Sequence, residues 1–200
     1  MTLFLKYIII FIIMNNFDEK PILDYIKKYL PFREEHILST RDLSVKLAKH
    51  YNVDVNKASI AALCHDLGKR YKEEEIRKIL LEYDKKEYPK HITSALLHAR
   101  VSAIITIEEF HIKDDDIISA IESHTVGHAN MSMLEKIIYA SDYLEPTRKL
   151  ETADKLREEI FINFDEAFLK VVLESIYFVL SKKQYLSDKT IELYNSLVIK

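Results

Sequence analysis

Apolar residues recur at every third or fourth position through most of the chain, which is the spacing of one face of an α-helix. After Pro21, for example, Ile22, Ile26 and Leu30 share such a face, and Pro31 ends the segment. The same pattern predicts helices over about 21–30, 34–50, 54–68, 73–83, 93–111, 114–124, 132–146, 152–182 and 189–198.

Residues at the ends of these segments agree with helix boundaries. Asp54 and Asp114 stand at N-cap positions, and Ser132 begins a capping box. Gly68 follows a helix rich in small residues, and we expect it to turn the chain in the left-handed region. The sequence has no repeat, low-complexity tract or linker. We therefore predict an all-α helical bundle that forms a single compact domain over residues 17–198.

Glycine is rare, and its rarity excludes several classes of protein. The 200 residues contain two glycines, Gly68 and Gly127. Glycine-rich phosphate loops and dinucleotide-binding fingerprints need two or three close together, so neither is present. All-β folds, with a turn every 8–12 residues, are also disfavoured. Apolar residues make up 48% of the chain and charged residues 30%, which is typical of a folded domain.

Charge and cysteine content narrow the partners and the compartment. The net charge is −3, from 29 basic and 32 acidic residues, and no basic stripe indicates nucleic-acid binding. An anionic ligand must then be bound by local charge. The single cysteine, Cys64, excludes an internal disulfide and a cysteine-based zinc site. These features predict a cytoplasmic protein with no nucleic-acid partner.

The N-terminal segment, residues 3–14, is strongly apolar. As a helix it would span about 18 Å, short of the ~30 Å core of a bilayer. A secretory signal, with Lys6 before its apolar region, is the alternative, but no small-residue cleavage site follows Met14. We expect residues 1–16 to be an N-terminal extension from a mis-called start, with Met14 as the initiator, and we expect no membrane partner.

The chemistry of the chain centres on an adjacent histidine and aspartate, His65 and Asp66, just before Gly68. Such a pair is weak evidence by itself. Asp142 strengthens it, because the run 137–144 otherwise reads as core and a carboxylate buried there needs a partner or a metal. The other polar residues placed on predicted helices among apolar neighbours are His36, His98 and His124.

A metal site would explain this set of residues. Two imidazoles, His36 and His65, and two carboxylates, Asp66 and Asp142, suit iron, manganese, cobalt or zinc. An ion bound there would polarise a phosphoryl group and lower the pKa of a water molecule. The pattern therefore predicts metal-assisted phosphate hydrolysis.

The order of these residues resembles that of the HD-domain phosphohydrolase superfamily. The short sequence motifs around these residues are more discriminating. They resemble those of the YqeK-type family, which are bacterial symmetrical bis(5'-nucleosyl)-tetraphosphatases that split diadenosine tetraphosphate into two ADP. The resemblance covers about residues 17–198. The matching motifs are Arg33-Glu34-Glu35-His36, His65-Asp66-Leu67-Gly68-Lys69, Leu97-His98-Ala99, His124-Thr125-Val126-Gly127 and the run from Tyr139 to Arg148.

The resemblance implies an all-α HD-domain fold, an iron ion and a nucleotide site. The implied metal ligands are His36, His65, Asp66 and Asp142. The implied catalytic residues are Asp66, Lys69, His98 and His124. The implied nucleotide-binding residues are Arg33, His36, Asp66, Leu67, Gly68, Lys69, His98, His124, Thr125, Asp142, Arg148, Tyr185, Leu186, Ser187, Asp188, Lys189 and Thr190.

Three of these residues have cationic side chains that are expected to face the phosphates. Arg33 lies one helical turn before His36, Lys69 would neutralise charge that develops on a phosphoryl group, and Arg148 offers a bidentate fork. His98 and His124 have two alternative roles. Either one protonates the departing ADP, or both support a second metal.

The chain departs from the family pattern at several positions. Val126 stands where threonine is usual, His128 where arginine is frequent, and Arg100 where proline is common. Near the C-terminus Ser187 and Asp188 replace an aromatic residue and a proline. The segment 185–190 is expected to bind the base, so these changes leave base preference open.

Two other functions stay open at this point. One is an HD hydrolase of another nucleotide, and the other is a weakly active nucleotide-sensing module. A dinucleoside polyphosphate and ADP are the expected partners, and a homodimer is left open. The histidines outside the matching motifs, which we expect at the surface, are His50, His91, His111 and His128.

Overall fold

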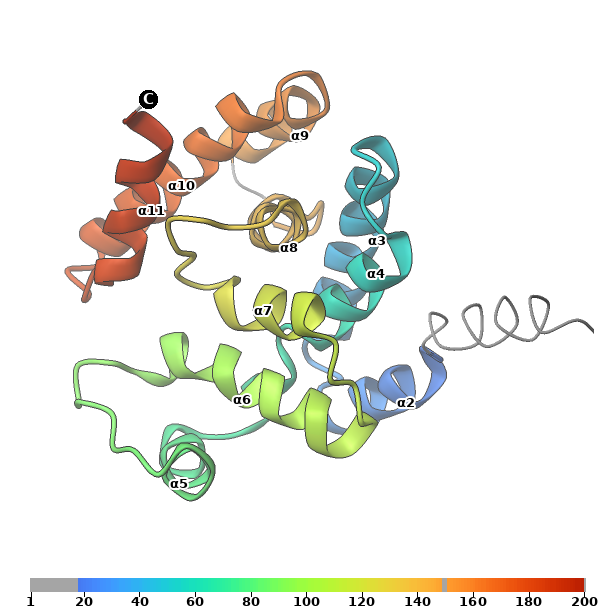
Figure 1. The fold of residues 1–200 in the computed structure, drawn as a ribbon, viewed down its shortest axis with the longest axis vertical. Helices are drawn as coiled ribbons and strands as arrows, with labels where there is room; N and C mark the ends of the chain where they lie inside the picture. The colour runs from blue at the N-terminus through green and yellow to red at the C-terminus, as the bar shows by residue number, and fades with distance from the viewer. Residues whose placement is uncertain (1–17, 149–150, 200) are drawn as a thin grey trace, which may run out of the picture.

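The computed structural model describes residues 18–148 and 151–199. Within these ranges the regular structure is entirely helical (Figure 1). The helices are α2 (Lys20–Tyr29), α3 (Glu34–His50), α4 (Val55–Cys64), the short 3-10 helix η1 (Leu67–Arg70), α5 (Glu73–Asp84), α6 (Ser94–Phe110), α7 (Asp115–Ser123), α8 (Met133–Leu144), α9 (Glu151–Ile162), α10 (Phe164–Ser181) and α11 (Asp188–Val198).

The predicted all-α fold is confirmed, and so are the predicted caps. Asp54 and Asp114 each accept hydrogen bonds from backbone N–H groups at the start of a helix. Ser132 and Glu135 form the capping box of α8. The range 152–182 contains two helices, because Asn163 leaves the helical conformation and its side chain caps the second helix by accepting from the N–H of Glu166.

The N-terminal extension predicted for residues 1–16 lies outside the described residues. Within the described ranges, the helices lack the combination of length and apolar character needed to cross a bilayer.

Helix α8 runs through the middle of the bundle and is seen nearly end-on in Figure 1. It packs against α3, α4, α7, α9 and α10. Its side chains Ile137, Ile138 and Leu144 are fully buried. A central helix of this kind places polar side chains on its remaining face beside several other helices at once, and Asp142 lies on that face.

The two glycines are required at their positions for different structural reasons. Gly127 has φ +63°, the left-handed conformation that favours glycine. Gly68 does not have the left-handed conformation expected for it, and that prediction is wrong. It lies inside η1, where a Cβ atom would come within 2.3 Å of the carbonyl oxygen of His98. Gly68 is therefore required by the close approach of η1 to the backbone of α6.

Candidate metal and nucleotide site

Six polar side chains from five helices meet at the centre of the bundle. The six are His36 from α3, His65 and Asp66 from the end of α4, His98 from α6, His124 from the end of α7, and Asp142 from α8. Asp142 is half-buried and the other five are buried. Their ligand atoms form three overlapping groups, each within 4.8 Å: His36, His65 and Asp66; His65, His124 and Asp142; and Asp66, His98 and His124.

The histidines of this cluster turn their Nε2 atoms toward one another. The Nε2 atoms of His36 and His65 are 3.3 Å apart, and those of His98 and His124 are 3.1 Å apart. Behind each ring the Nδ1 atom is anchored. His65 Nδ1 lies 2.6 Å from the carbonyl oxygen of Ala62. A carbonyl only accepts, so the hydrogen is on Nδ1 and the Nε2 lone pair faces the cluster.

The same anchoring recurs in the other rings. His124 Nδ1 lies 2.7 Å from the carbonyl oxygen of Ile121, and His98 Nδ1 lies 3.2 Å from that of Ser94. His36 differs, because its Nδ1 lies 3.1 Å from a carboxylate oxygen of Glu145. All four rings are thus presented as metal ligands are, with the second nitrogen bonded to an acceptor.

Asp66 links the two halves of the cluster. Its Oδ2 contacts Arg33 and lies 3.6 Å from Nε2 of His36 and of His65. Its Oδ1 lies 3.0 Å from His98 Nε2 and 3.8 Å from His124 Nε2. Burial opposes ionisation of Asp66, but His65 and His98 outweigh it and hold the pKa of the carboxyl well below its usual value.

Asp142 is ionised for a similar reason. Burial again opposes the charge, and the neighbouring His36, His65 and Arg148 side chains outweigh it and hold the pKa of Asp142 well below its usual value. His124 behaves in the opposite way, because burial lowers the pKa of its imidazole to about 3. The cluster therefore combines two anionic carboxylates with imidazole nitrogens.

These donors fit a divalent metal ion. Ligand atoms about 2.1 Å from one ion lie about 3–3.4 Å from each other. His36 Nε2 lies 3.0 Å from Oδ1 of Asp142, and His65 Nε2 lies 3.7 Å from the same oxygen. A small contraction would bring His36, His65, Asp66 and Asp142 onto one ion, the set predicted from sequence.

A cavity of about 440 Å³ opens beside the cluster. Its wall combines charged side chains, including Asp66, Lys69 and Arg148, with apolar side chains from α6 and α10. Within the described residues, three buried polar atoms in its wall lack a hydrogen-bond partner: Arg33 Nε, Thr125 Oγ1 and the hydroxyl of Tyr139. The lining residues are Arg33, Asp66, Lys69, Ala95, Leu96, His98, His124, Thr125, Tyr139, Asp142, Tyr143, Arg148, Ser175, Phe178, Val179 and Gln184.

The predicted phosphate-binding cations lie in the cavity wall beside the cluster. Arg148 Nη2 is 2.9 Å from Asp142 Oδ1, and Arg33 contacts Asp66. Lys69 is half-buried in the wall, and burial lowers the pKa of its amine. Leu67 and Gly68 are buried in η1 and set the position of Lys69 from behind.

The segment 185–190 lies on the neighbouring loop and the start of α11. Among the described residues the cavity wall includes Gln184 from this loop but not residues 185–190. The Tyr185 ring packs 4.7 Å from that of His91, and Thr190 Oγ1 donates to the carbonyl oxygen of Val126 at 2.9 Å. Leu186 and Ser187 are half-buried, while Asp188 and Lys189 are exposed. The contact predicted between this segment and the base stays a prediction.

The histidines expected at the surface lie away from the cluster. His50, His91 and His111 are exposed, and His128 is half-buried against Glu135 at 2.7 Å.

Sequence reasoning assigned no role to several residues of the site. Glu145 and Tyr139 lie inside the matching motif from Tyr139 to Arg148, and this position could have indicated that they belong to the site. Ser175, Phe178 and Val179 come from an apolar stretch of α10 that reads as ordinary core. Their position on the cavity depends on how α10 packs, which periodicity does not reveal.

Comparison with known proteins agrees with this arrangement. The HD domain family matches residues 33–147, more than half of the chain. This chain therefore belongs to the HD domain family.

Two curated relatives have a more specific name. The chain is 34% identical, over 88% of its length and 95% of the relative's, to a "Bis(5'-nucleosyl)-tetraphosphatase, symmetrical" of Halalkalibacterium halodurans. It is 32% identical to the protein of the same name from Bacillus subtilis, over 82% of this chain and 88% of the relative.

A solved structure has the same fold. It is the crystal structure of a protein from Clostridium acetobutylicum that is described as a "predicted HD superfamily hydrolase involved in NAD metabolism". Its TM-score is 0.85 at 37% identity, and the match covers 92% of this chain and 98% of that one.

Proposed function

We propose that this protein is a metal-dependent hydrolase that cleaves diadenosine tetraphosphate symmetrically into two ADP. The observation that carries the proposal is the position of the histidine–aspartate cluster in the wall of a cavity that is also lined by cationic side chains and by apolar side chains. Such a cavity suits a ligand with a polyphosphate at one end and a nucleoside at the other. The symmetrical tetraphosphatases similar to this chain support the choice of substrate.

The proposed metal ligands are His36, His65, Asp66 and Asp142, and the proposed metal is iron, with manganese and cobalt as substitutes. When bound, such an ion supplies Lewis-acid polarisation of a phosphoryl oxygen and a nucleophile at neutral pH. The anchored Nδ1 atoms keep the Nε2 lone pairs of both histidines directed at the ion.

The remaining residues act on the polyphosphate. Arg33 and Arg148 bind its oxygens from the two sides of the cluster, and Thr125 donates a hydroxyl hydrogen bond. Lys69 offsets the negative charge that grows on the phosphoryl group in the transition state. Because only the central anhydride has two phosphates on each side, binding of one ADP half in the cavity selects that bond.

His98 and His124 are proposed to support a second ion. Their Nε2 atoms both face Asp66 Oδ1, and both Nδ1 hydrogens are committed to backbone carbonyls. A general acid would instead need a proton on Nε2, where His124 is disfavoured by burial.

The nucleoside of the bound half is proposed to lie against the apolar part of the wall, where Leu96, Phe178 and Val179 provide contact area for a base. The segment 185–190 is proposed to complete the base site from the neighbouring loop. We also propose that residues 17–198 form the HD unit and that the protein acts in the cytoplasm without a nucleic-acid partner.

The test uses the full chain freed of metal and then supplied with iron, manganese or cobalt. Diadenosine tetraphosphate should be consumed only after metal is restored, and Asp66→Ala should abolish both metal binding and turnover. Consumption of mononucleotides in preference to the dinucleotide would favour another HD hydrolase. Tight ADP binding without turnover under every metal would favour a nucleotide sensor.

A further inference from the structure

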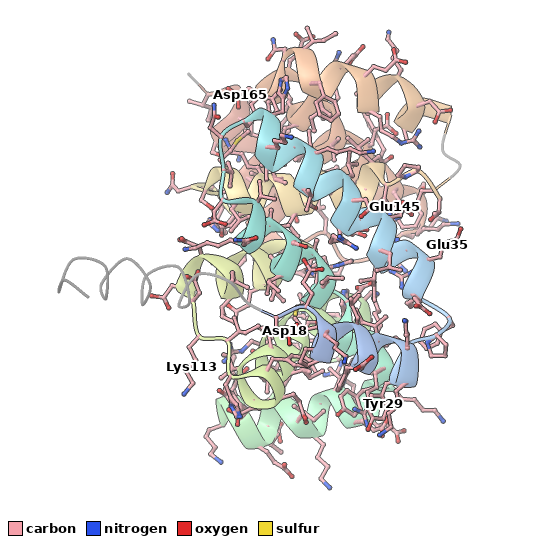
Figure 2. The ribbon with its side chains drawn as sticks, turned by 90° about the vertical axis from the view of Figure 1, so that its right-hand side faces the viewer. Asp18, Tyr29, Glu35, Lys113, Glu145 and Asp165 are labelled. Atoms are coloured by element: carbon pink, nitrogen blue, oxygen red, sulfur yellow. The ribbon has the colours of Figure 1, made fainter. Side chains whose placement is uncertain are left out.

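Glu145 is a buried carboxylate at the end of α8 that contacts both halves of the proposed machinery. Its side chain is 0% exposed. Oε1 lies 3.1 Å from His36 Nδ1 and accepts a hydrogen bond from Thr147 Oγ1 at 2.6 Å. Oε2 accepts from the backbone N–H of Thr147 at 2.7 Å. Figure 2 shows Glu145 beside α3, the helix that carries His36.

These contacts identify the charge state of the carboxyl. A buried carboxylate is costly unless hydrogen bonds compensate it. The carboxyl of Glu145 accepts from the backbone N–H and the hydroxyl of Thr147 and faces Nδ1 of His36, so donors surround both of its oxygens. Glu145 is therefore an anion that can only accept hydrogen bonds.

An anionic acceptor at Nδ1 determines the form of His36. The ring must carry a hydrogen on Nδ1, so Nε2, which faces Asp142 and Asp66, is the nitrogen available to bind an ion. The other three histidines of the cluster use neutral carbonyl oxygens for this purpose. A carboxylate does more, because its charge makes the imidazole a stronger donor to a cation.

The same carboxylate closes the turn that leads to Arg148. The backbone N–H of Arg148 donates to the carbonyl oxygen of Glu145 at 3.1 Å, and the two bonds from Thr147 brace the turn from within. From this turn the Arg148 side chain reaches back to Asp142 at 2.9 Å. The direction of the guanidinium thus depends on a turn that Glu145 holds closed.

From this geometry we propose that Glu145 is a positioning residue that orients His36 toward the metal and Arg148 toward the substrate phosphates. The second part rests on the proposed function, whereas the first concerns metal binding by itself. Within the described part of the chain, Glu145 is not one of the residues that line the cavity. It therefore acts through His36 and Arg148.

The experiment compares Glu145→Gln with Glu135→Gln in the full, metal-free chain. Glutamine has one acceptor oxygen, so it cannot serve His36 and the N–H of Thr147 together. Glu135 is a matched control on the same helix. It is buried, contacts His128 at 2.7 Å, accepts from Ser119 and closes a capping box, but it is not among the residues that line the cavity.

The readouts are Mn²⁺ affinity by calorimetry and ADP affinity, neither of which needs turnover. Glu145→Gln should weaken Mn²⁺ binding about 10–100-fold and weaken ADP binding as well, whereas Glu135→Gln should lower thermal stability and leave both affinities near wild type. Thr147→Val keeps the His36 contact, so it should weaken ADP binding and retain Mn²⁺ affinity. This variant also tests the proposal if Glu145→Gln does not fold.

Wild-type Mn²⁺ affinity in folded Glu145→Gln would overturn the proposal, and so would equal losses in the two glutamine variants. Loss of Mn²⁺ affinity in Thr147→Val would overturn the division of roles. A wild-type protein that binds Mn²⁺ but leaves the dinucleotide intact would instead contradict the proposed function, and the Mn²⁺ comparison between variants would still stand.

Discussion

Arg148 and His36 approach the same oxygen of Asp142. Arg148 Nη2 lies 2.9 Å from Asp142 Oδ1, and His36 Nε2 lies 3.0 Å from it. A metal ion bound by His36 and Asp142 would take the lone pairs that now face the guanidinium. Arg148, which is about one-third exposed at the cavity wall, is then free to turn its donors toward a phosphate.

Arg148→Gln should therefore affect substrate more than metal. Loss of a charged fork to phosphate should raise the KM for diadenosine tetraphosphate by about 10–100-fold. Mn²⁺ affinity should stay within a few-fold of wild type, because glutamine leaves Asp142 available to the ion. Steady-state kinetics and calorimetry on the same preparation measure the two effects. A large loss of Mn²⁺ affinity with unchanged KM would assign Arg148 to the metal site instead.

Lys69→Met should act mainly on kcat. Methionine keeps an unbranched side chain in the wall but removes the charge that offsets the developing phosphoryl charge. We expect kcat to fall about 100–1000-fold with little change in KM, as for loss of one transition-state donor. Rate measurements at saturating metal provide the test. A rise in KM with kcat intact would show that Lys69 contributes ground-state binding only.

Gly68→Ala should damage both stability and turnover. The added Cβ would meet the carbonyl oxygen of His98 at 2.3 Å, and a backbone atom cannot move aside as a side chain can. Overpacking of this kind costs about 1–3 kcal/mol of the free energy of unfolding. His98 should shift with α6 and lower kcat. Urea denaturation and kinetics check both effects, and wild-type values in both would contradict this account of Gly68.

Glu135 should make stability depend on pH in the acidic range. Burial opposes its charge, but hydrogen bonds from Ser119, His128 and Ser132 lower its pKa below the ordinary 4.5. A carboxyl with a lowered folded pKa contributes stability fully above the unfolded pKa and loses it as pH falls through the folded pKa.

The expected result is a pH-dependent gap between wild type and Glu135→Gln. At pH 7 the variant should be less stable by about 1–3 kcal/mol, and the gap should narrow as pH falls below 4.5. His128, the titratable partner of Glu135, is present in both proteins. Urea denaturation at several pH values measures the gap. A gap that widens on acidification would contradict the lowered pKa.

Most of the fold could be predicted from the sequence because its helices are amphipathic and capped by local residues. The capping box at Ser132 and the helix over 34–50 follow from residues a few positions apart. The break at Asn163 was missed because apolar residues continue on both sides of it, and the cap depends on one side-chain hydrogen bond. Gly68 was misjudged because its constraint comes from α6, which periodicity does not place.

The proposed metal ligands of the candidate site could be predicted from the sequence, whereas the contacts of Glu145 and part of the cavity wall could not. His36, His65, Asp66 and Asp142 were recognisable from their order and flanking motifs, although they are far apart in sequence. The contact of Glu145 with His36 joins residues more than 100 positions apart and has no local signature. The α10 part of the cavity wall was hidden because Phe178 and Val179 look like core residues in a string of letters.

The most direct test of the central claim is product analysis with a mixed dinucleotide, adenosine tetraphosphoguanosine, and the manganese-loaded full chain. Cleavage of the central anhydride predicts equal amounts of ADP and GDP by ion-exchange chromatography, with no ATP, GTP, AMP or GMP. Any ATP with GMP, or GTP with AMP, as the initial products would place the cut at another anhydride and contradict symmetrical hydrolysis.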